Sequence, residues 1–119
     1  MILALHHVQL AMPRGAEVRA RAFYTGVLGF EETEKPEILK RRGGLWFVAA
    51  GAALHLGVEE PFVPARKAHP AFRVASLEAA KRRLVGRGIA FRDGEDLPGI
   101  RRIYLDDPFG NRIELLEPI

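Results

Sequence analysis

The fold is decided by a stretch near the end of the chain, Asp106-Asp107-Pro108-Phe109-Gly110-Asn111-Arg112-Ile113-Glu114-Leu115-Leu116-Glu117-Pro118. Turn-forming residues come first, and an alternating strand with the carboxylate of Glu114 at its centre follows. An earlier stretch, Ala49-Ala50-Gly51-Ala52-Ala53-Leu54-His55-Leu56-Gly57-Val58, has the same organisation. A shift of 59 residues superposes Gly51 on Gly110 and His55 on Glu114. The chain therefore contains a repeat whose two copies carry different ligand-type groups at one shared position.

Both copies predict the same order of elements: one strand, one helix and then three strands. Apolar residues that alternate with polar ones, or that recur at helical spacing, mark each element, and Gly or Pro residues separate them. In the first copy we expect a strand over 3–12, a helix over 16–28, a strand over 30–41 interrupted at Pro36, and strands over 45–49 and 52–59. In the second we expect a strand over 68–75, a helix capped by Ser76 and running to Val85, and strands over 89–92, 101–106 and 112–116.

This order places the chain in the α+β class, as two βαβββ modules whose curved mixed sheets surround a cavity. We expect one domain over residues 1–119, with a first module of about 1–60, a linker over 61–67 and a second module of about 68–119. Proline stands at both ends of the linker core, Pro61 and Pro64, and no periodicity runs through it.

Composition narrows the function classes. The chain has no cysteine, and no apolar run reaches the roughly 20 residues of a membrane helix, so we expect a cytoplasmic protein without a membrane partner. A net charge of +3, from arginines that are scattered rather than clustered, argues against nucleic-acid binding. A small-molecule substrate is the expected partner.

Four polar side chains occupy matching places in the two copies. His7 in the first strand matches His69 with a shift of 62 residues, and His55 matches Glu114. Each alternates with apolar neighbours, which places all four on the sheet face away from the helices. His6 points the other way from His7 and is given no role.

Three imidazoles and one carboxylate are suitable ligands for Zn²⁺, Ni²⁺, Fe²⁺ or Mn²⁺, so we expect one divalent metal ion per site. Taken singly, each histidine is more often a surface or hydrogen-bonded residue, and the repeat-related placement is what favours a shared site. Three further polar residues face the same cavity and could hold an anionic substrate, although ordinary cross-strand pairing is the more usual explanation for each: Gln9, Arg73 and Arg112. Trp46 and Phe47 wall the pocket or fill the core, and the core is the expected place.

The chain resembles the vicinal oxygen chelate superfamily, which includes glyoxalase I, fosfomycin-resistance thiol transferases, extradiol dioxygenases and bleomycin-resistance proteins. The resemblance is carried by His7-Val8-Gln9-Leu10-Ala11-Met12, by Ala22-Phe23-Tyr24-Thr25-Gly26-Val27-Leu28-Gly29-Phe30, and by Asp107-Pro108-Phe109-Gly110-Asn111-Arg112-Ile113-Glu114-Leu115. It implies a glyoxalase-like fold and a homodimer whose sites are built from modules of one or both chains. It also implies that His7, His69 and Glu114 are the family's metal ligands and that His55 stands at a fourth ligand position.

The sequence departs from the members of known activity. His55 replaces the glutamate of bacterial-type glyoxalase I, which changes the charge of the site and removes one candidate base. The chain also lacks the C-terminal extension of the fosfomycin-resistance enzymes and is too short for a two-domain extradiol dioxygenase.

Our leading hypothesis is a metal-dependent lyase, isomerase or thiol transferase. The metal acts as a Lewis acid on two adjacent oxygens of a small substrate and stabilises an enolate or alkoxide, while Glu114 or a metal-bound water carries the proton. The alternatives are a non-catalytic small-molecule-binding or resistance protein of the bleomycin-binding type, and a metal-binding domain that has lost its chemistry.

Overall fold

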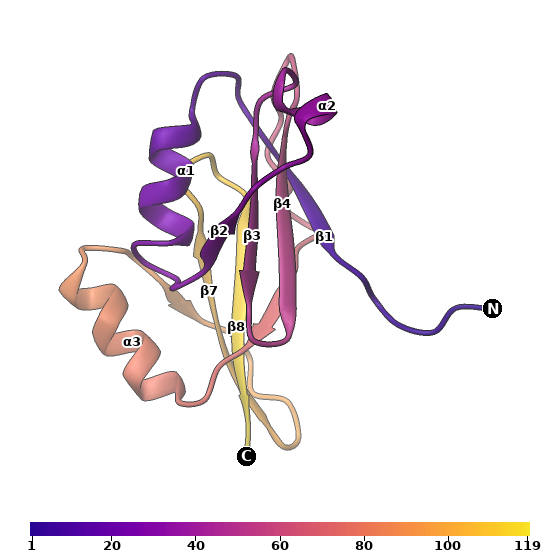
Figure 1. The fold of residues 1–119 in the computed structure, drawn as a ribbon. Helices are drawn as coiled ribbons and strands as arrows, with labels where there is room; N and C mark the ends of the chain where they lie inside the picture. The colour runs from indigo at the N-terminus through magenta and orange to yellow at the C-terminus, as the bar shows by residue number, and fades with distance from the viewer. The chain divides into compact units, whose positions relative to one another are not determined.

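The computed structural model describes all residues, 1–119, and the chain divides into two compact units (Figure 1). Unit one comprises Met1–Pro64 and unit two comprises Ala65–Ile119.

Unit one holds one four-stranded sheet and two helices. Its elements are β1 (Val8–Met12), α1 (Glu17–Tyr24), β2 (Glu31–Thr33), α2 (Glu37–Lys40), β3 (Leu45–Ala49) and β4 (Ala52–Val58). The strand order is β1-β4-β3-β2, in which β1 runs parallel to β4 and the other neighbours are antiparallel. The helix α1 supplies the crossover that a parallel return requires.

Unit two repeats this arrangement with one helix. Its elements are β5 (Ala71–Arg73), α3 (Leu77–Gly86), β6 (Arg92–Asp93), β7 (Ile100–Asp106) and β8 (Arg112–Pro118). The strand order β5-β8-β7-β6 matches that of unit one, and β5 again runs parallel to β8. The predicted α+β class and the double βαβββ order are therefore confirmed, as two open mixed sheets with helices.

The core of unit one is an aromatic cluster between α1 and β3. Phe23 and Tyr24 of α1 are buried, and the Tyr24 ring stacks on the fully buried Phe47 with 5.5 Å between ring centroids. Strand alternation adds Leu54 and Leu56 from β4 to the same side. Phe47 therefore fills the core, as expected, whereas the same expectation for Trp46 is wrong, because Trp46 is half-buried on the opposite face.

The core of unit two is aliphatic. Ile103 and Leu105 of β7 are fully buried, and Ile113 and Leu115 of β8 are buried beside them. The helix α3 contributes Leu77 and Leu84, and its first turn is capped by Ser76, whose hydroxyl accepts the Ala79 N–H as predicted. Because side chains alternate along a strand, the intervening polar residues of β7 and β8 share the other face.

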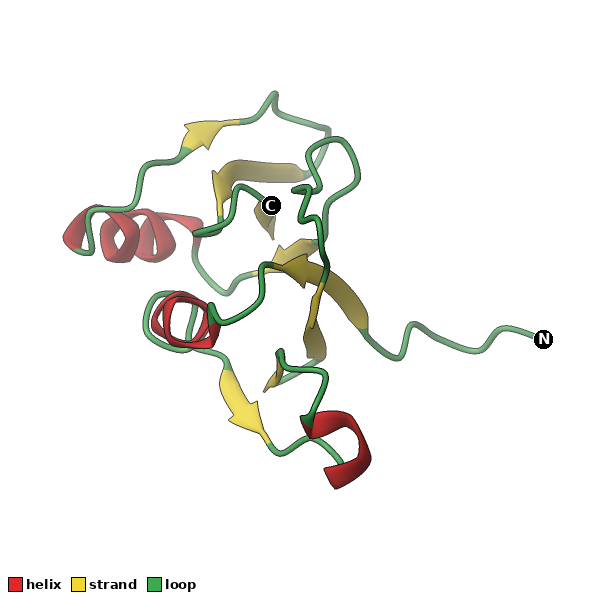
Figure 2. Ribbon diagram, turned by 90° about the horizontal axis from the view of Figure 1, so that it is seen from above, coloured by secondary structure: helices red, strands yellow, loops and turns green.

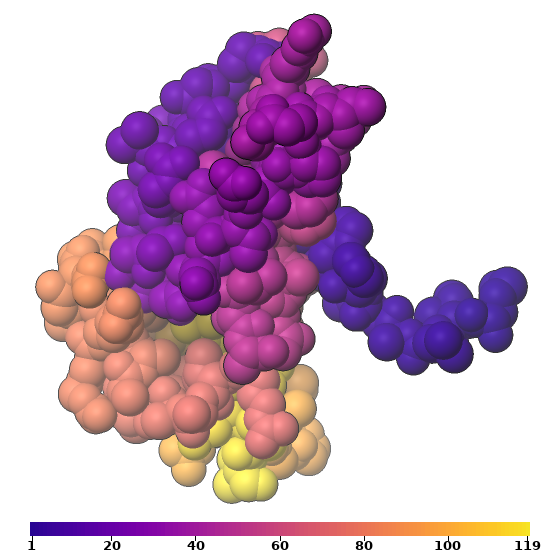
Figure 3. All heavy atoms as spheres, in the orientation of Figure 1, coloured from indigo at the N-terminus to yellow at the C-terminus, as the bar shows by residue number.

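Three expectations about unit one are wrong. Residues 37–40, expected as strand, form the short helix α2, which Figure 2 shows as a single turn. The first strand begins at Val8 rather than Leu3, so residues 1–7 form an extended arm that carries exposed apolar side chains (Figure 3). The spacing of Val18, Ala22, Phe23 and Val27 predicts that these residues form the buried face of the first helix, but Val18 is 75% exposed and Ala22 is exposed as well, and Ala20 is buried instead.

The remaining boundaries differ by a few residues. Helical spacing predicts that Val85 shares the buried face of α3 with Leu77 and Leu84, but Val85 is exposed. The strand expected over 89–92 is the two-residue β6 at Arg92–Asp93. Neither α1 nor α3 has the length or apolarity that crossing a lipid bilayer requires, and α2 is shorter still.

Candidate metal and substrate site

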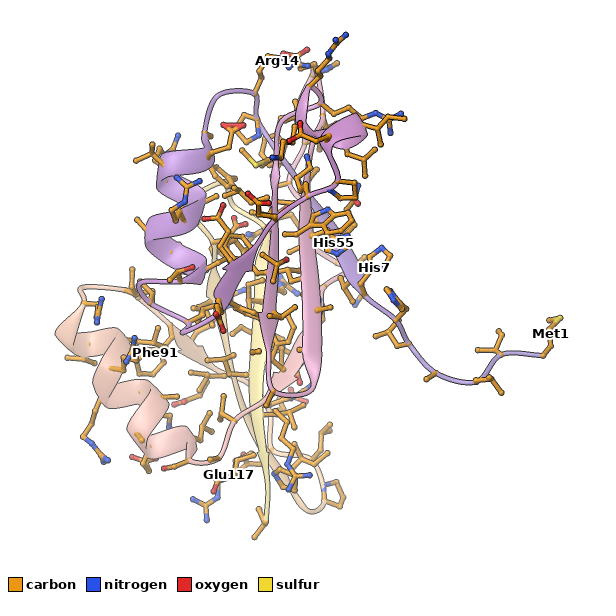
Figure 4. The ribbon with its side chains drawn as sticks, viewed as in Figure 1. Met1, His7, Arg14, His55, Phe91 and Glu117 are labelled. Carbon is orange, nitrogen blue, oxygen red and sulfur yellow. The ribbon has the colours of Figure 1, made fainter.

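His7 and His55 lie together on the face of the unit-one sheet that is opposite α1 (Figure 4). Their rings stack with 4.1 Å between centroids, and the Trp46 indole stacks on the other side of His55, also at 4.1 Å and only 5° from parallel. The strand register explains the contact between Trp46 and His55, because Trp46 on β3 lies directly opposite His55 on β4. On the other side of β4, Gln9 of β1 lies opposite His55, and His7 precedes Gln9 by two residues. His55 is thus the middle ring of a three-ring stack.

Burial and neighbouring cations favour the neutral form of His55. Desolvation is the largest cause that lowers the pKa of His55 below its ordinary value of 6.5, and the positive charges of His7, His6 and Lys35 lower it further. A neutral imidazole has a free lone pair at neutral pH, which is the form that binds a metal ion.

His69 and Glu114 form the corresponding pair in unit two. His69 Nε2 lies 3.0 Å from Glu114 Oε1, and Glu114 is only 6% exposed. The Glu114 N–H donates to the Pro70 carbonyl, which holds β8 beside the end of the segment that carries His69. The pair therefore lies at the point where the first and last strands of the unit meet.

The tautomer of His69 follows from its second hydrogen bond. His69 Nδ1 lies 2.8 Å from the Lys67 carbonyl oxygen, which can only accept, so Nδ1 carries the proton. In a neutral imidazole Nε2 then has a lone pair, and that lone pair faces a carboxylate oxygen. Two acceptors at this distance repel each other unless a proton or a metal cation lies between them.

The donor set fits a divalent metal ion. Each unit alone brings together two of the four candidate donors, and no group of three His, Asp or Glu side chains at metal-binding spacing occurs. Imidazole nitrogen and carboxylate oxygen are the donors that Zn²⁺, Ni²⁺, Fe²⁺ and Mn²⁺ accept. The backbone carbonyl that orients His69 is the usual outer partner of a metal-binding histidine.

The three candidate substrate residues lie on these same faces. Gln9 is exposed and its amide covers Gly57, where any larger side chain would collide with it. Arg73 is exposed on β5 opposite Leu116. Arg112 is half-buried, and its guanidinium carbon lies 5.5 Å from the centroid of the Tyr104 ring.

Sequence reasoning missed three residues of this face: Arg92, Arg102 and Tyr104. Tyr104 lies directly opposite Glu114, and its ring meets His69 edge-on at 5.5 Å. Arg102 Nη1 lies 3.8 Å from Glu114 Oε1. The hairpin turn at 107–111 was predicted, and counting outward from it pairs Asp106 with Arg112 and Tyr104 with Glu114, so the signal was present in the sequence.

A surface hollow in unit one lies apart from these residues. It lies at the β3–β4 turn and is lined by His6, Glu31 and residues 48–53. None of the four candidate donors lines it, so it is a surface depression apart from the candidate site.

Comparison with known proteins places these features in a family context. The model of the Glyoxalase/Bleomycin resistance protein/Dioxygenase superfamily matches residues 4–115. A protein from Bacillus anthracis assigned to the glyoxalase family has a structure similar to this one with a TM-score of 0.97 and 47% identity, covering 100% of this chain and 98% of its own. No curated protein matches the chain.

Two further solved structures are more distant. TnmS3, an antibiotic binding protein from Streptomyces sp. CB03234, is 27% identical with a TM-score of 0.72, and the match covers 99% of this chain and 100% of that one. The fosfomycin resistance protein FosX from Listeria monocytogenes is 20% identical with a TM-score of 0.78, and the match covers 100% of this chain and 96% of that one. The likeness to FosX concerns the fold alone.

Proposed function

The chain belongs to the glyoxalase/bleomycin resistance protein/dioxygenase superfamily, and from this we propose that it is a divalent-metal-dependent enzyme acting on a small substrate with two adjacent oxygens. Members of this superfamily commonly use divalent metals. The proposed ligands are His7, His69 and Glu114, with His55 at the fourth ligand position. A lyase, isomerase or group-transfer reaction at those oxygens is the class of chemistry that fits.

The observation that carries the proposal is the contact between His69 Nε2 and Glu114 Oε1. The Lys67 carbonyl accepts the Nδ1 proton of His69, so Nε2 faces the buried carboxylate oxygen at 3.0 Å, and in the neutral imidazole that nitrogen carries the lone pair that binds a cation. A proton or a metal cation between these two atoms would stabilise the contact, and the metal content of the protein distinguishes the two. A histidine nitrogen and a buried carboxylate oxygen directed at each other are a donor pair that suits a divalent cation.

Glu114 and His69 have different chemical roles beside the proposed metal ion. A bound divalent cation would supply Lewis-acid polarisation of the substrate oxygens. Glu114 is buried and beside His69, so its carboxylate can hold or release a proton at Oε1. His69 is held in one tautomer by Lys67, which keeps its Nε2 directed at the same place.

Metal content measured by mass spectrometry tests the proposal. We expect stoichiometric Zn, Ni, Fe or Mn in the full-length protein, and we expect Glu114→Gln to weaken metal binding by at least about tenfold. The control is Glu95→Gln, because Glu95 is an exposed carboxylate in unit two outside the site. If the wild-type protein takes up no metal tightly, or if both variants bind it equally well, the proposal is wrong.

A second candidate function is the binding of a planar compound without turnover. The specific observation in its favour is the stack of Trp46, His55 and His7, whose outer member His7 is exposed. Such a stack can extend onto a flat aromatic ligand. The antibiotic binding protein TnmS3, at 27% identity, shows that binding proteins of this size share the fold.

Tryptophan fluorescence separates the two functions, because Trp46 is the only tryptophan in the chain. If the protein is a binding module, planar aromatic compounds should quench the fluorescence of metal-free protein, and His7→Ala should weaken that quenching. If the protein is an enzyme, metal and turnover of a panel of diketones and hemithioacetals should be lost together in Glu114→Gln.

A further inference from the structure

Three arginines from neighbouring strands converge on one tyrosine ring in unit two. The guanidinium carbons of Arg92, Arg102 and Arg112 lie 5.6, 5.4 and 5.5 Å from the centroid of the Tyr104 ring. None of the three is a candidate metal ligand.

The strand register produces this convergence. Arg92 on β6 lies opposite Tyr104 on β7, and Tyr104 lies opposite Glu114 on β8. Arg102 precedes Tyr104 by two residues and Arg112 precedes Glu114 by two, so all of these side chains leave the same face of the sheet. The opposite face at these strands is the aliphatic core under α3.

The arginines are only loosely paired with carboxylates. Arg92 Nη1 lies 3.7 Å from Asp106 Oδ1, and Arg102 Nη1 lies 3.8 Å from Glu114 Oε1. Both distances exceed those of hydrogen bonds. Asp106 also pairs with Arg66 at 2.9 Å, so two guanidinium groups share this one carboxylate.

Arg112 adds a donor that no group of the protein accepts. Its Nε is buried and has no hydrogen-bond partner. A buried donor without an acceptor is costly, and native structures keep few of them. The four guanidinium groups of Arg66, Arg92, Arg102 and Arg112 also outnumber the two nearby carboxylates, Asp106 and Glu114, by two positive charges.

We propose that Arg92, Arg102 and Arg112 form a binding site for a phosphoryl-type oxyanion, which the natural substrate carries beside the atoms that react. The planar guanidinium fork matches the oxygens of such a group, and a dianion balances the two unmatched charges. The Tyr104 ring lines the site and joins it to His69, so an anion held here lies next to the proposed metal ligands. In naming a substrate class this inference rests on the proposed function, but the anion site itself requires no metal.

Titration of metal-free, full-length protein with inorganic phosphate at low ionic strength tests the site, by calorimetry or by phosphorus NMR. We expect saturable binding that Arg92→Gln and Arg102→Gln each weaken at least tenfold, while Arg102→Lys has a smaller effect because it keeps the charge and loses the fork. Arg82→Gln, an exposed arginine of α3, is the matched control and should bind phosphate like the wild type. Circular dichroism verifies that each variant is folded.

The inference is overturned if phosphate does not bind, if Arg82→Gln weakens binding as much as Arg102→Gln does, or if acetate competes as well as phosphate. Its failure is distinguishable from that of the proposed function, because each is measured separately. Stoichiometric metal without phosphate binding removes only the anion site. Phosphate binding without metal leaves the anion site intact and removes the metal-dependent reaction.

Discussion

His55 shows how one residue acquires its properties from its immediate neighbours. Trp46 and His7 cover both faces of its ring, so solvation of the imidazolium form is reduced. Burial is accordingly the largest cause of its lowered pKa, ahead of the charges of His7, His6 and Lys35. At neutral pH the residue is therefore a stacking ring and a lone-pair donor rather than a cation.

The pH dependence of stability should reflect this residue. The folded-state pKa of His55 lies below the unfolded value of 6.5, so the unfolded chain binds more protons in that window. The stabilisation is complete above pH 6.5 and is lost as the pH falls from 6.5 toward the folded-state pKa. We expect metal-free wild-type protein to lose stability to denaturant over this range, and His55→Phe, which keeps the stack without titrating, to lose less. Equal losses in the two proteins would contradict the assignment, which proton NMR of the ring can check directly.

Hydrogen bonds of Asn111 hold the turn between β7 and β8 in place. Asn111 is fully buried, its side-chain oxygen accepts the Ala65 N–H at 2.9 Å, and its amide donates to Asp107 Oδ2 at 2.9 Å. Asp107 Oδ1 in turn accepts the N–H groups of Phe109 and Asn111. These bonds fix the turn between β7 and β8, and with it the register that sets Tyr104 opposite Glu114.

Asn111→Ala should therefore destabilise the protein strongly. The substitution removes the acceptor of the half-buried Ala65 N–H and one donor to the buried Asp107 carboxylate, and we expect a loss of about 2–4 kcal/mol in the free energy of unfolding. Pro108→Ala in the same turn is the control, because Pro108 is exposed. Chemical denaturation of both variants measures the effect, and similar midpoints for the two would show that the buried bonds contribute little.

At the scale of elements, the start of β3 depends on a close approach of two backbones. Gly44 has a φ of +86°, and a Cβ there would overlap the Leu56 carbonyl oxygen of β4. Only glycine combines this conformation with this contact. The position of β3 beside β4 brings Trp46 onto His55, so one glycine supports the aromatic stack from two residues away.

Gly44→Ala should separate β3 from β4 at this end. We expect a loss of more than about 2 kcal/mol in stability, because the positive φ and the overlap with backbone both oppose the side chain. Gly51→Ala is the control, since a Cβ there meets nothing and its effect should stay within about 0.5 kcal/mol. Thermal unfolding and the fluorescence of Trp46 report the outcome, and equal stability of the two variants would contradict it.

The length of an element determined how well its sequence pattern predicted it. The repeat predicted two sheets with the same order of elements. The alternation of apolar and polar residues predicted that His69 and Glu114 share one face, because a period of two is a strong signal for a strand. The pattern failed at residues 37–40, where Glu37, Ile38, Leu39 and Lys40 form one helical turn with an ion pair between Lys40 and Glu37. A four-residue segment is too short for either period to be decisive.

The sequence predicted which face of each sheet carries the site residues, but it did not predict which side chains contact one another. Placing His7, His55, His69 and Glu114 on the faces opposite the helices needed only alternation. The stack of Trp46 on His55 and the arginines around Tyr104 needed the pairing register, which depends on turns such as 107–111 and on close contacts such as that of Gly44. Arg92 was the hardest to place, because its strand has only two residues.

At the scale of the whole molecule, the exposed arm offers a surface for self-association. Residues Met1, Ile2, Leu3 and Leu5 are 80% or more exposed, although all are apolar. Exposed apolar side chains in a row are typical of contact surfaces. A homodimer, which the family resemblance implies, would give this arm a place to bind.

We therefore expect the full-length protein to have twice the 13.3 kDa mass of the single chain in light scattering. Removal of residues 2–5 should weaken dimerisation while circular dichroism stays unchanged, because the arm lies outside both sheets. Val18→Ala, which shortens an exposed side chain on α1, is the control for an apolar residue outside the arm. A full-length chain that is monomeric at high concentration would rule out the dimer, and a truncated chain that dimerises normally would rule out the arm.

The arm also has a practical consequence for purification. It leads directly into His6 and His7, and His6 Nδ1 lies 2.9 Å from His7 Nδ1. A polyhistidine tag fused before Met1 would place additional imidazoles on this free segment, next to a proposed ligand. Such a tag could capture nickel from the affinity resin and pass for native metal content. A tag that follows the exposed Ile119, or a tagless preparation, avoids this source of error.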